Sequence, residues 1–138
     1  MPKLPSLDTE KADHGRWVEY VPGIEVLIAR AGNRAARDLL TELSQKNLRK
    51  IQAGQTHVIE AIHREVCAKC IIKGWRGLSL DGKKEEKYTP EKALEVLKDP
   101  RYLEFYEFVQ AEAGLDNEYR EQSIKEAAGN LQTSSAGD

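Results

Sequence analysis

The sequence of 138 residues has few cysteines and no long apolar run. Its two cysteines, Cys67 and Cys70, provide no disulfide framework, which favours a reducing cytoplasm. No apolar stretch approaches the roughly 20 residues of a membrane-spanning helix, and the first five residues lack the apolar segment of a secretion signal. The net charge of −2 is untypical of nucleic-acid binders, which usually present a strongly basic face. We therefore expect no membrane partner and no nucleic-acid partner.

The composition that remains is that of a globular domain with a solvated outside. Hydrophobic residues make up 40% of the chain and charged residues 32%. We expect a flexible N-terminal arm in residues 1–14, a single helical domain in residues 15–128, and a disordered tail in residues 129–138, where the composition is small and polar. The predicted fold is mainly α, with four to five helices and an N-terminal β-hairpin.

The expected elements follow from apolar spacing and from turn residues. Residues 17–21 and 24–28 are rich in β-branched and aromatic side chains and flank Pro22-Gly23, a pattern that predicts the hairpin. A helix starting near Val58 organises the rest of the chain, because its apolar residues recur every three or four positions. We expect this helix to end at the glycines of the segment Gly74-Trp75-Arg76-Gly77, since glycine permits a sharp exit.

Capping residues mark the other helices. Asn33 predicts the start of a helix over residues 34–53, which would pair antiparallel with the helix from Val58. Thr89 and Asp99 each precede a proline, a combination that favours helix starts. Gly114 is expected to end the helix that follows Asp99-Pro100, and Asp116 to cap a last, weaker helix through Tyr119, Ile124 and Ala127.

The cysteines raise the question of a metal or redox site. His63 and Cys67 are four residues apart on one helical face, but Cys70 lies seven residues from His63, a rise of roughly 10 Å along a helix. Both cysteines are better interpreted as buried small hydrophobes. The remaining histidines, His14 and His57, have no catalytic pattern beside them, and the segment 81–84 lacks the spacing of a phosphate loop. The sequence therefore predicts no enzyme, no metal and no cofactor.

The helix after Pro100 carries four of the nine aromatic residues of the chain, Tyr102, Phe105, Tyr106 and Phe108. Together with Leu103 and Val109 these side chains cover an arc too wide for an ordinary amphipathic helix. Two interpretations stay open: the helix is the central core helix, or part of it is a contact surface. Aromatic side chains suit a contact surface because they bury a large area with few rotatable bonds. We name these four aromatic residues as candidate partner-binding residues.

Charge is unevenly distributed along the sequence. Six basic residues and only two acidic ones lie between Arg30 and Lys50, whereas seven acidic and two basic residues lie between Glu104 and Glu126. This distribution fits two ordinary solvated faces. It also fits a bipolar molecule whose copies pair end to end, since complementary patches steer association.

Several turn and cap motifs resemble those of the small tail assembly chaperones of long-tailed bacteriophages. The resemblance covers residues 15–128 and is carried by the motifs Gly15-Arg16-Trp17-Val18, Pro22-Gly23-Ile24-Glu25-Val26, Gly74-Trp75-Arg76-Gly77-Leu78, Asp81-Gly82 and Tyr88-Thr89-Pro90-Glu91-Lys92-Ala93. Near the C-terminal end the sequence has Gly129-Asn130 where such proteins often have lysine-asparagine.

The resemblance implies a non-enzymatic role in tail assembly. It implies binding to the tape-measure protein, recruitment of the tail-tube protein, self-association, and a location in the cytoplasm of the infected bacterial host rather than in the mature virion. The alternative is a permanent structural protein of the phage, such as a head–tail joining or tail-completion protein. The resemblance leaves open which client segment is bound.

Overall fold

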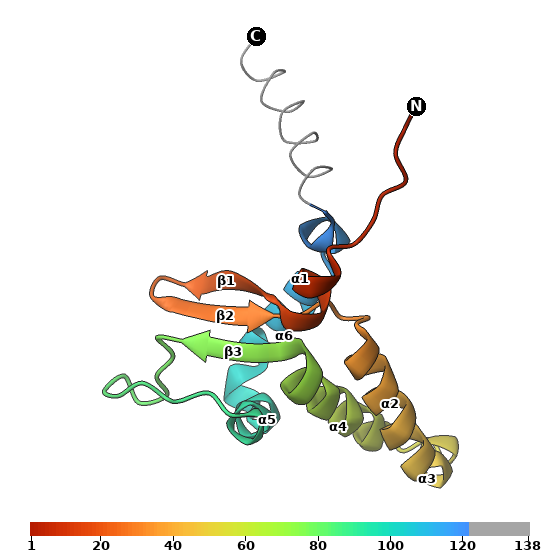
Figure 1. Ribbon diagram of the computed structural model, residues 1–138. Helices are drawn as coiled ribbons and strands as arrows, with labels where there is room; N and C mark the ends of the chain where they lie inside the picture. The colour runs from red at the N-terminus through yellow and green to blue at the C-terminus, as the bar shows by residue number, and fades with distance from the viewer. Residues whose placement is uncertain (122–138) are drawn as a thin grey trace.

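The computed structural model describes residues 1–121 as a three-stranded antiparallel sheet packed against helices (Figure 1). The strands are β1 (Arg16–Val21), β2 (Ile24–Ile28) and β3 (Ile72–Arg76), in the spatial order β1-β2-β3. The α-helices are α1 (Thr9–His14), α2 (Arg34–Lys46), α3 (Leu48–Gln52), α4 (Thr56–Val66), α5 (Pro90–Lys98) and α6 (Leu103–Ala113). Shorter turns are the π-helical η1 (Cys67–Ile71) and the 3-10 helices η2 (Pro100–Tyr102) and η3 (Asp116–Tyr119). The predicted mainly α fold with an N-terminal hairpin is confirmed.

The hairpin forms where the sequence predicts it. In β1 and β2, Val18 pairs with Val26 and Trp17 with Leu27, and the register shifts between Glu19 and Val21, next to the turn. Val26 and Ile28 are buried, and the rings of α6 pack on Tyr20 from the same side of the sheet. The hairpin is therefore held by the helices, as a two-stranded ribbon in water requires.

The third strand corrects the prediction of one helix from Val58 to the glycines. Helix α4 ends at Val66, the turn η1 follows, and Ile72–Arg76 leaves as strand β3. In β3, Ile72 pairs with Ile28 and Trp75 with Val26, so two β-branched or aromatic side chains extend the buried face of the sheet. The helical spacing of the apolar residues could not reveal this, because the pairing partner lies more than 40 residues earlier in the chain.

The N-terminal segment contains a helix that the sequence analysis did not predict. Residues 1–14 were expected to be a flexible arm, but Thr9–His14 form helix α1, capped by the side chain of Asp8. Ala12 is buried, and its carbonyl accepts a hydrogen bond from the amide of Arg30. The amide of Asp8 donates to the carbonyl of Tyr119, which lies near the other end of the described chain. This distant contact orders a segment that has no strong local pattern of its own.

The predicted helix starts at Asn33 and Thr89 are confirmed, and one helix is shorter than expected. The amide of Ala36 donates to the Asn33 side chain, and the amide of Lys92 donates to that of Thr89, so both residues cap helices. The helix over residues 34–53 is interrupted at Asn47, which separates α2 from α3.

Later boundaries follow the prediction in part. Gly114 ends α6 as predicted. Asp116 opens only the short 3-10 turn η3, preceded by Leu115 at the cap position. The expected continuation through Ile124 and Ala127, and the predicted disordered tail of residues 129–138, lie outside the described residues.

The core lies between the sheet, the turn η1 and the helices α5 and α6. Its largest fully buried side chains are Tyr119, Ile28, Ile72, Val26, Val109 and Cys67. Helices α2 and α4 pack side by side and project from this core together with α3 (Figure 1). None of the helices described for residues 1–121 has the length and apolarity that crossing a lipid bilayer requires.

Candidate protein-binding surfaces

Helix α6 places the four predicted partner-binding residues in two different environments. Phe105 and Tyr106 are core residues, with only 6% and 8% of their surfaces exposed. Tyr102 and Phe108 are half-buried at the border of the core. The ring of Tyr20 meets Phe105 edge-on at 5.4 Å and Phe108 at 4.6 Å between centroids. The aromatic arc therefore serves mainly to fix the hairpin on α6, and its accessible part is near Tyr102.

A groove opens at that accessible end of α6, between the tip of the hairpin and the segment after β3. We call it the aromatic groove; its volume is about 190 Å³. Tyr102 and Phe105 line it from the helical side, and Tyr20 and Ile24 line it from the hairpin. The segment after β3 and two charged side chains complete its wall, with Leu78, Ser79, Leu80, Arg101 and Glu104. The aromatic groove thus combines two of the four predicted residues with apolar side chains that the sequence analysis did not single out.

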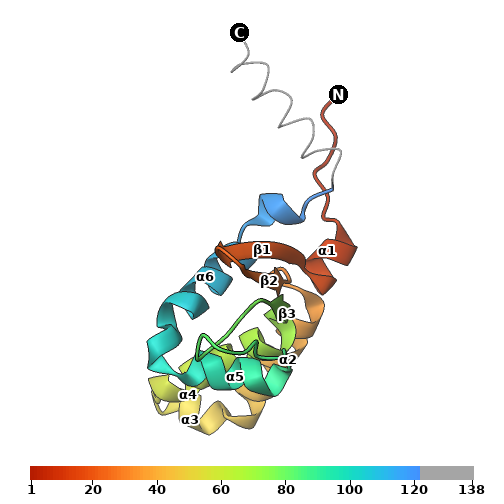
Figure 2. The same ribbon diagram turned by 90° about the vertical axis from the view of Figure 1, so that its left-hand side faces the viewer.

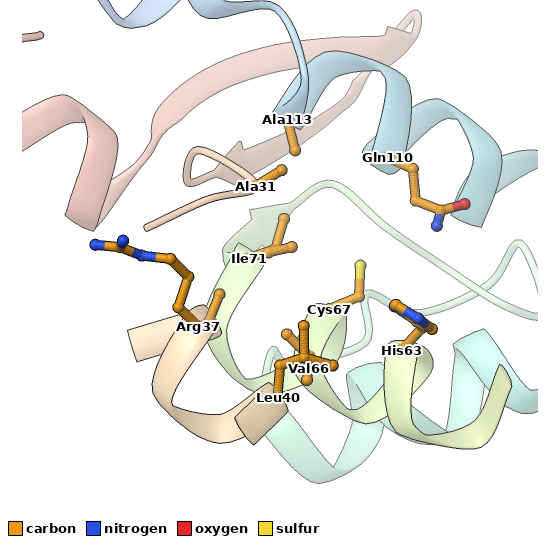
Figure 3. Close-up of a pocket in the computed structure, with 10 residues that line it drawn as sticks. Ala31, Arg37, Leu40, His63, Val66, Cys67, Ile71, Gln110 and Ala113 are labelled. Atoms are coloured by element: carbon orange, nitrogen blue, oxygen red, sulfur yellow. The ribbon is translucent and has the colours of Figure 1, made fainter. Parts of the chain in front are cut away.

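A larger hollow lies between α2, α4 and α6 (Figure 3). We call it the helical cleft; its volume is about 310 Å³. Its apolar lining comes from Ala31, Ala36, Leu40, Val66, Cys67, Ile71 and Ala113. Three polar side chains stand around it, each on a different helix: Arg37 on α2, His63 on α4 and Gln110 on α6. In Figure 3, Arg37 and His63 lie at opposite ends of the cleft, and Gln110 extends toward it from above.

The helical cleft has one cation, Arg37, at its edge, where the guanidinium extends outward (Figure 3), and no acidic residue lines it. Within residues 1–121 the side chains of Arg37, His63 and Gln110 form no hydrogen bond or ion pair with the protein. Burial raises the pKa of the Cys67 thiol to about 12, so this sulfur is a neutral thiol at physiological pH. The arrangement is suited to binding an apolar group that carries an acid beside it.

The residues considered for a metal site are dispersed by the fold. His63 and Cys67 both line the helical cleft, whereas Cys70 does not. Both thiols are free, and both are buried, which confirms their interpretation as core residues. Among residues 1–121, no three side chains of histidine, cysteine, aspartate or glutamate are gathered in a way that could hold a metal ion.

Sequence reasoning did not find the helical cleft, because its walls come from segments up to 82 residues apart, from Ala31 to Ala113, that meet only through packing. Two signals were present. Arg37 belongs to the basic stretch between Arg30 and Lys50, and Cys67 belongs to the apolar stripe of the central helix. Neither signal indicates a hollow by itself, because the hollow forms only where the π-helical turn η1 places Cys67 and Ile71 opposite α6.

The fold and its surfaces define a small, mainly helical domain with apolar hollows at its surface, among them the aromatic groove and the helical cleft. The sequence model of the YdaY prophage protein family matches residues 28–130, which is more than half of the chain. The chain therefore belongs to the YdaY prophage protein family and is a phage-derived protein. No curated protein and no solved structure matches it.

Proposed function

We propose that this protein is a phage tail assembly chaperone that binds the tape-measure protein and helps recruit tail-tube subunits. Three observations support the proposal. The chain is phage-derived, its turn and cap motifs resemble those of tail assembly chaperones, and it has surface hollows suited to holding another polypeptide. The role is non-enzymatic and belongs to the cytoplasm of the infected host, with the protein absent from the mature virion.

The aromatic groove is the observation that carries the proposal. It is open to solvent, its walls are apolar, and its rim carries both Arg101 and Glu104. An amphipathic helix of a client can insert apolar side chains against Tyr102 and Leu80 while its polar side chains meet the charged rim. Burying such side chains contributes roughly 25 cal/mol for each Å² of apolar surface removed from water. Several weak sites of this kind, one on each copy, suit a long client.

Co-expression with the tape-measure protein of the same phage genome tests the proposal. The wild-type protein is expected to keep the client soluble. The double substitution Tyr102→Ser, Leu80→Ser is expected to abolish this effect, because it removes apolar surface from the groove. Leu115→Ser is the matched control, since Leu115 is an exposed apolar residue outside both hollows. Circular dichroism and thermal unfolding must show that all variants are folded. A client that stays insoluble with the wild-type protein would count against the proposal.

The second candidate function is that of a permanent structural protein, such as a head–tail joining or tail-completion protein. It also agrees with the phage origin of the family. Mass spectrometry of purified virions distinguishes the two functions. A chaperone is absent from the particles, whereas a structural protein is recovered in them at a fixed ratio to the other tail or neck proteins.

A further inference from the structure

Helix α6 presents an exposed leucine next to unpaired acids. Leu103 has 51% of its surface exposed, and Glu107 follows it by one helical turn on the same exposed face. Within residues 1–121, Glu104 and Glu107 form no ion pair. An exposed leucine beside unpaired carboxylates is the kind of group that the helical cleft is suited to bind.

The opposite charge lies beside the helical cleft and on α3, which contacts α2 and α4. Arg37 at the cleft, and Arg49 and Lys50 on α3, form no ion pair within the described residues. Helix α6 contains three acidic residues and no basic one. The two surfaces therefore match in both respects that matter for binding: one offers an apolar hollow with a cation, and the other an apolar side chain with anions.

We propose that the helical cleft of one copy of this chain binds the Leu103–Glu107 face of α6 of a second copy. Leu103 would enter the apolar hollow, and Glu107 would lie near Arg37. This inference deepens the proposed function, because it supplies the self-association that a chaperone coating a long client uses. It rests on the charge and shape of the described residues alone, and it is tested without the client.

The two surfaces share helix α6 but no residue, because the cleft is bounded by Gln110 and Ala113 near the end of that helix, whereas Leu103 and Glu107 lie in its first half. Figure 2 shows α6 on one flank and α2 on the other. One copy can therefore donate its α6 face to a second copy while its cleft receives the α6 face of a third. Such a head-to-tail contact produces a ring if the rotation between copies closes and an open filament if it does not. A single leucine with a few charges makes a weak contact, so we expect the assembly to depend on protein concentration and to weaken as salt rises.

Sedimentation velocity of the purified chain tests this inference by a charge-swap experiment. At low salt and high protein concentration, the wild-type mass is expected to exceed the 15.6 kDa of the monomer. Arg37→Glu and Glu107→Arg are each expected to return the protein to monomer. An equimolar mixture of the two variants is expected to restore association, because every cleft then meets an α6 face of opposite charge.

Lys83→Glu is the matched control, since it makes the same change of charge on an exposed loop residue outside the cleft and α6. It is expected to associate as the wild type does. Three outcomes would overturn the inference: a wild-type chain that stays monomeric at low salt, an oligomer that both charge variants leave intact, and a mixture that fails to restore association. If Arg37→Glu releases the client but leaves the oligomer unchanged, the cleft binds the client and not a second copy.

Discussion

The side-chain amide of Asn33 donates a hydrogen bond to the backbone carbonyl of Cys70, 2.9 Å away in the interior. The same amide donates to the carbonyl of Arg30 at 2.7 Å, and the carbonyl oxygen of the side chain accepts from the amide of Ala36. Asn33 is the buried polar side chain of the described core, with 5% of its surface exposed. It therefore connects the start of α2 to the turn η1, which forms the floor of the helical cleft.

Asn33→Ala is expected to lower the free energy of unfolding by about 2–4 kcal/mol. The loss of the helix cap contributes about 1 kcal/mol, and removing this donor from the buried carbonyl of Cys70 contributes about 1–3 kcal/mol. Urea unfolding measures the change. Asn47→Ala is the control, because the Asn47 side chain donates only to Leu43 and caps no helix through its side chain; we expect it to cost about 1 kcal/mol. Equal effects at the two positions would contradict this account.

Gly77→Ala is expected to destabilise the protein far more than Gly82→Ala. Both glycines have left-handed backbone conformations, with φ of +75° and +76°. A Cβ atom at Gly77 would lie 1.9 Å from the carbonyl oxygen of Gly23 in the hairpin turn, whereas a Cβ at Gly82 meets nothing within 4 Å. We expect Gly82→Ala to lower the free energy of unfolding by about 1 kcal/mol, from the backbone conformation alone. We expect Gly77→Ala to lower it by about 2–4 kcal/mol, because the backbone at residue 77 must also move away from the hairpin turn at Gly23.

Thermal and urea unfolding of these two glycine variants measure the difference. A similar loss of stability in both variants would show that the turn after β1 and the end of β3 do not touch in solution.

Tyr119→Phe is expected to lower the free energy of unfolding by about 1–2 kcal/mol. The hydroxyl of Tyr119 donates to the buried carbonyl of Ile28 at 2.8 Å, and the substitution leaves that carbonyl without this donor. Tyr102→Phe is the matched control, since the hydroxyl of Tyr102 forms no hydrogen bond within the described residues. Chemical denaturation compares the stability of the two variants. An equally negligible change in both would contradict the role given to the Tyr119 hydroxyl.

The Cys67 thiol is expected to make the protein less stable in alkaline solution. Burial raises the pKa of this thiol from 9.0 to about 12 in the folded state. Below pH 9 the thiol is protonated in both states and has no effect. Between pH 9 and 12 the unfolded chain releases this proton while the folded protein keeps it, so stability falls as pH rises. The free energy of unfolding falls by at most about 1.4 kcal/mol for each pH unit in this range.

Urea unfolding at pH 8, 9 and 10 measures this decline, and Cys67→Ala serves as the comparison because it removes the titrating group. The variant is expected to lose less stability between pH 9 and 10 than the wild type. Labelling of the folded protein at pH 8 with a thiol reagent gives an independent measurement: Cys67 should react only on unfolding. Rapid labelling of both cysteines in the folded protein would contradict the burial of the Cys67 sulfur.

The parts of the fold that depend on neighbouring residues could be predicted from the sequence. The hairpin around Pro22-Gly23, the caps at Asn33 and Thr89, and the end of α6 at Gly114 are all where local patterns place them. Each depends on the conformational preference or hydrogen bonding of residues close in sequence.

The parts that depend on distant residues could not be predicted. The segment Ile72–Arg76 is a strand because it pairs with β2, and Thr9–His14 is a helix that packs near Tyr119. The two candidate surfaces also combine features that depend on neighbouring residues with features that depend on distant ones. The aromatic residues of α6 were identified, but their burial depends on Tyr20 of the hairpin, and the helical cleft needs three helices in place.

The contacts of α1 with η3 also decide where additional polypeptide can be attached. The amide of Glu121 donates to the carbonyl of Ser6, so the chain leaves the described domain next to the point where it enters. This point lies away from the hairpin tip and from the α2–α4 pair (Figure 1). An affinity tag at the N-terminus would therefore start away from the hairpin tip and from the α2–α4 pair (Figure 1).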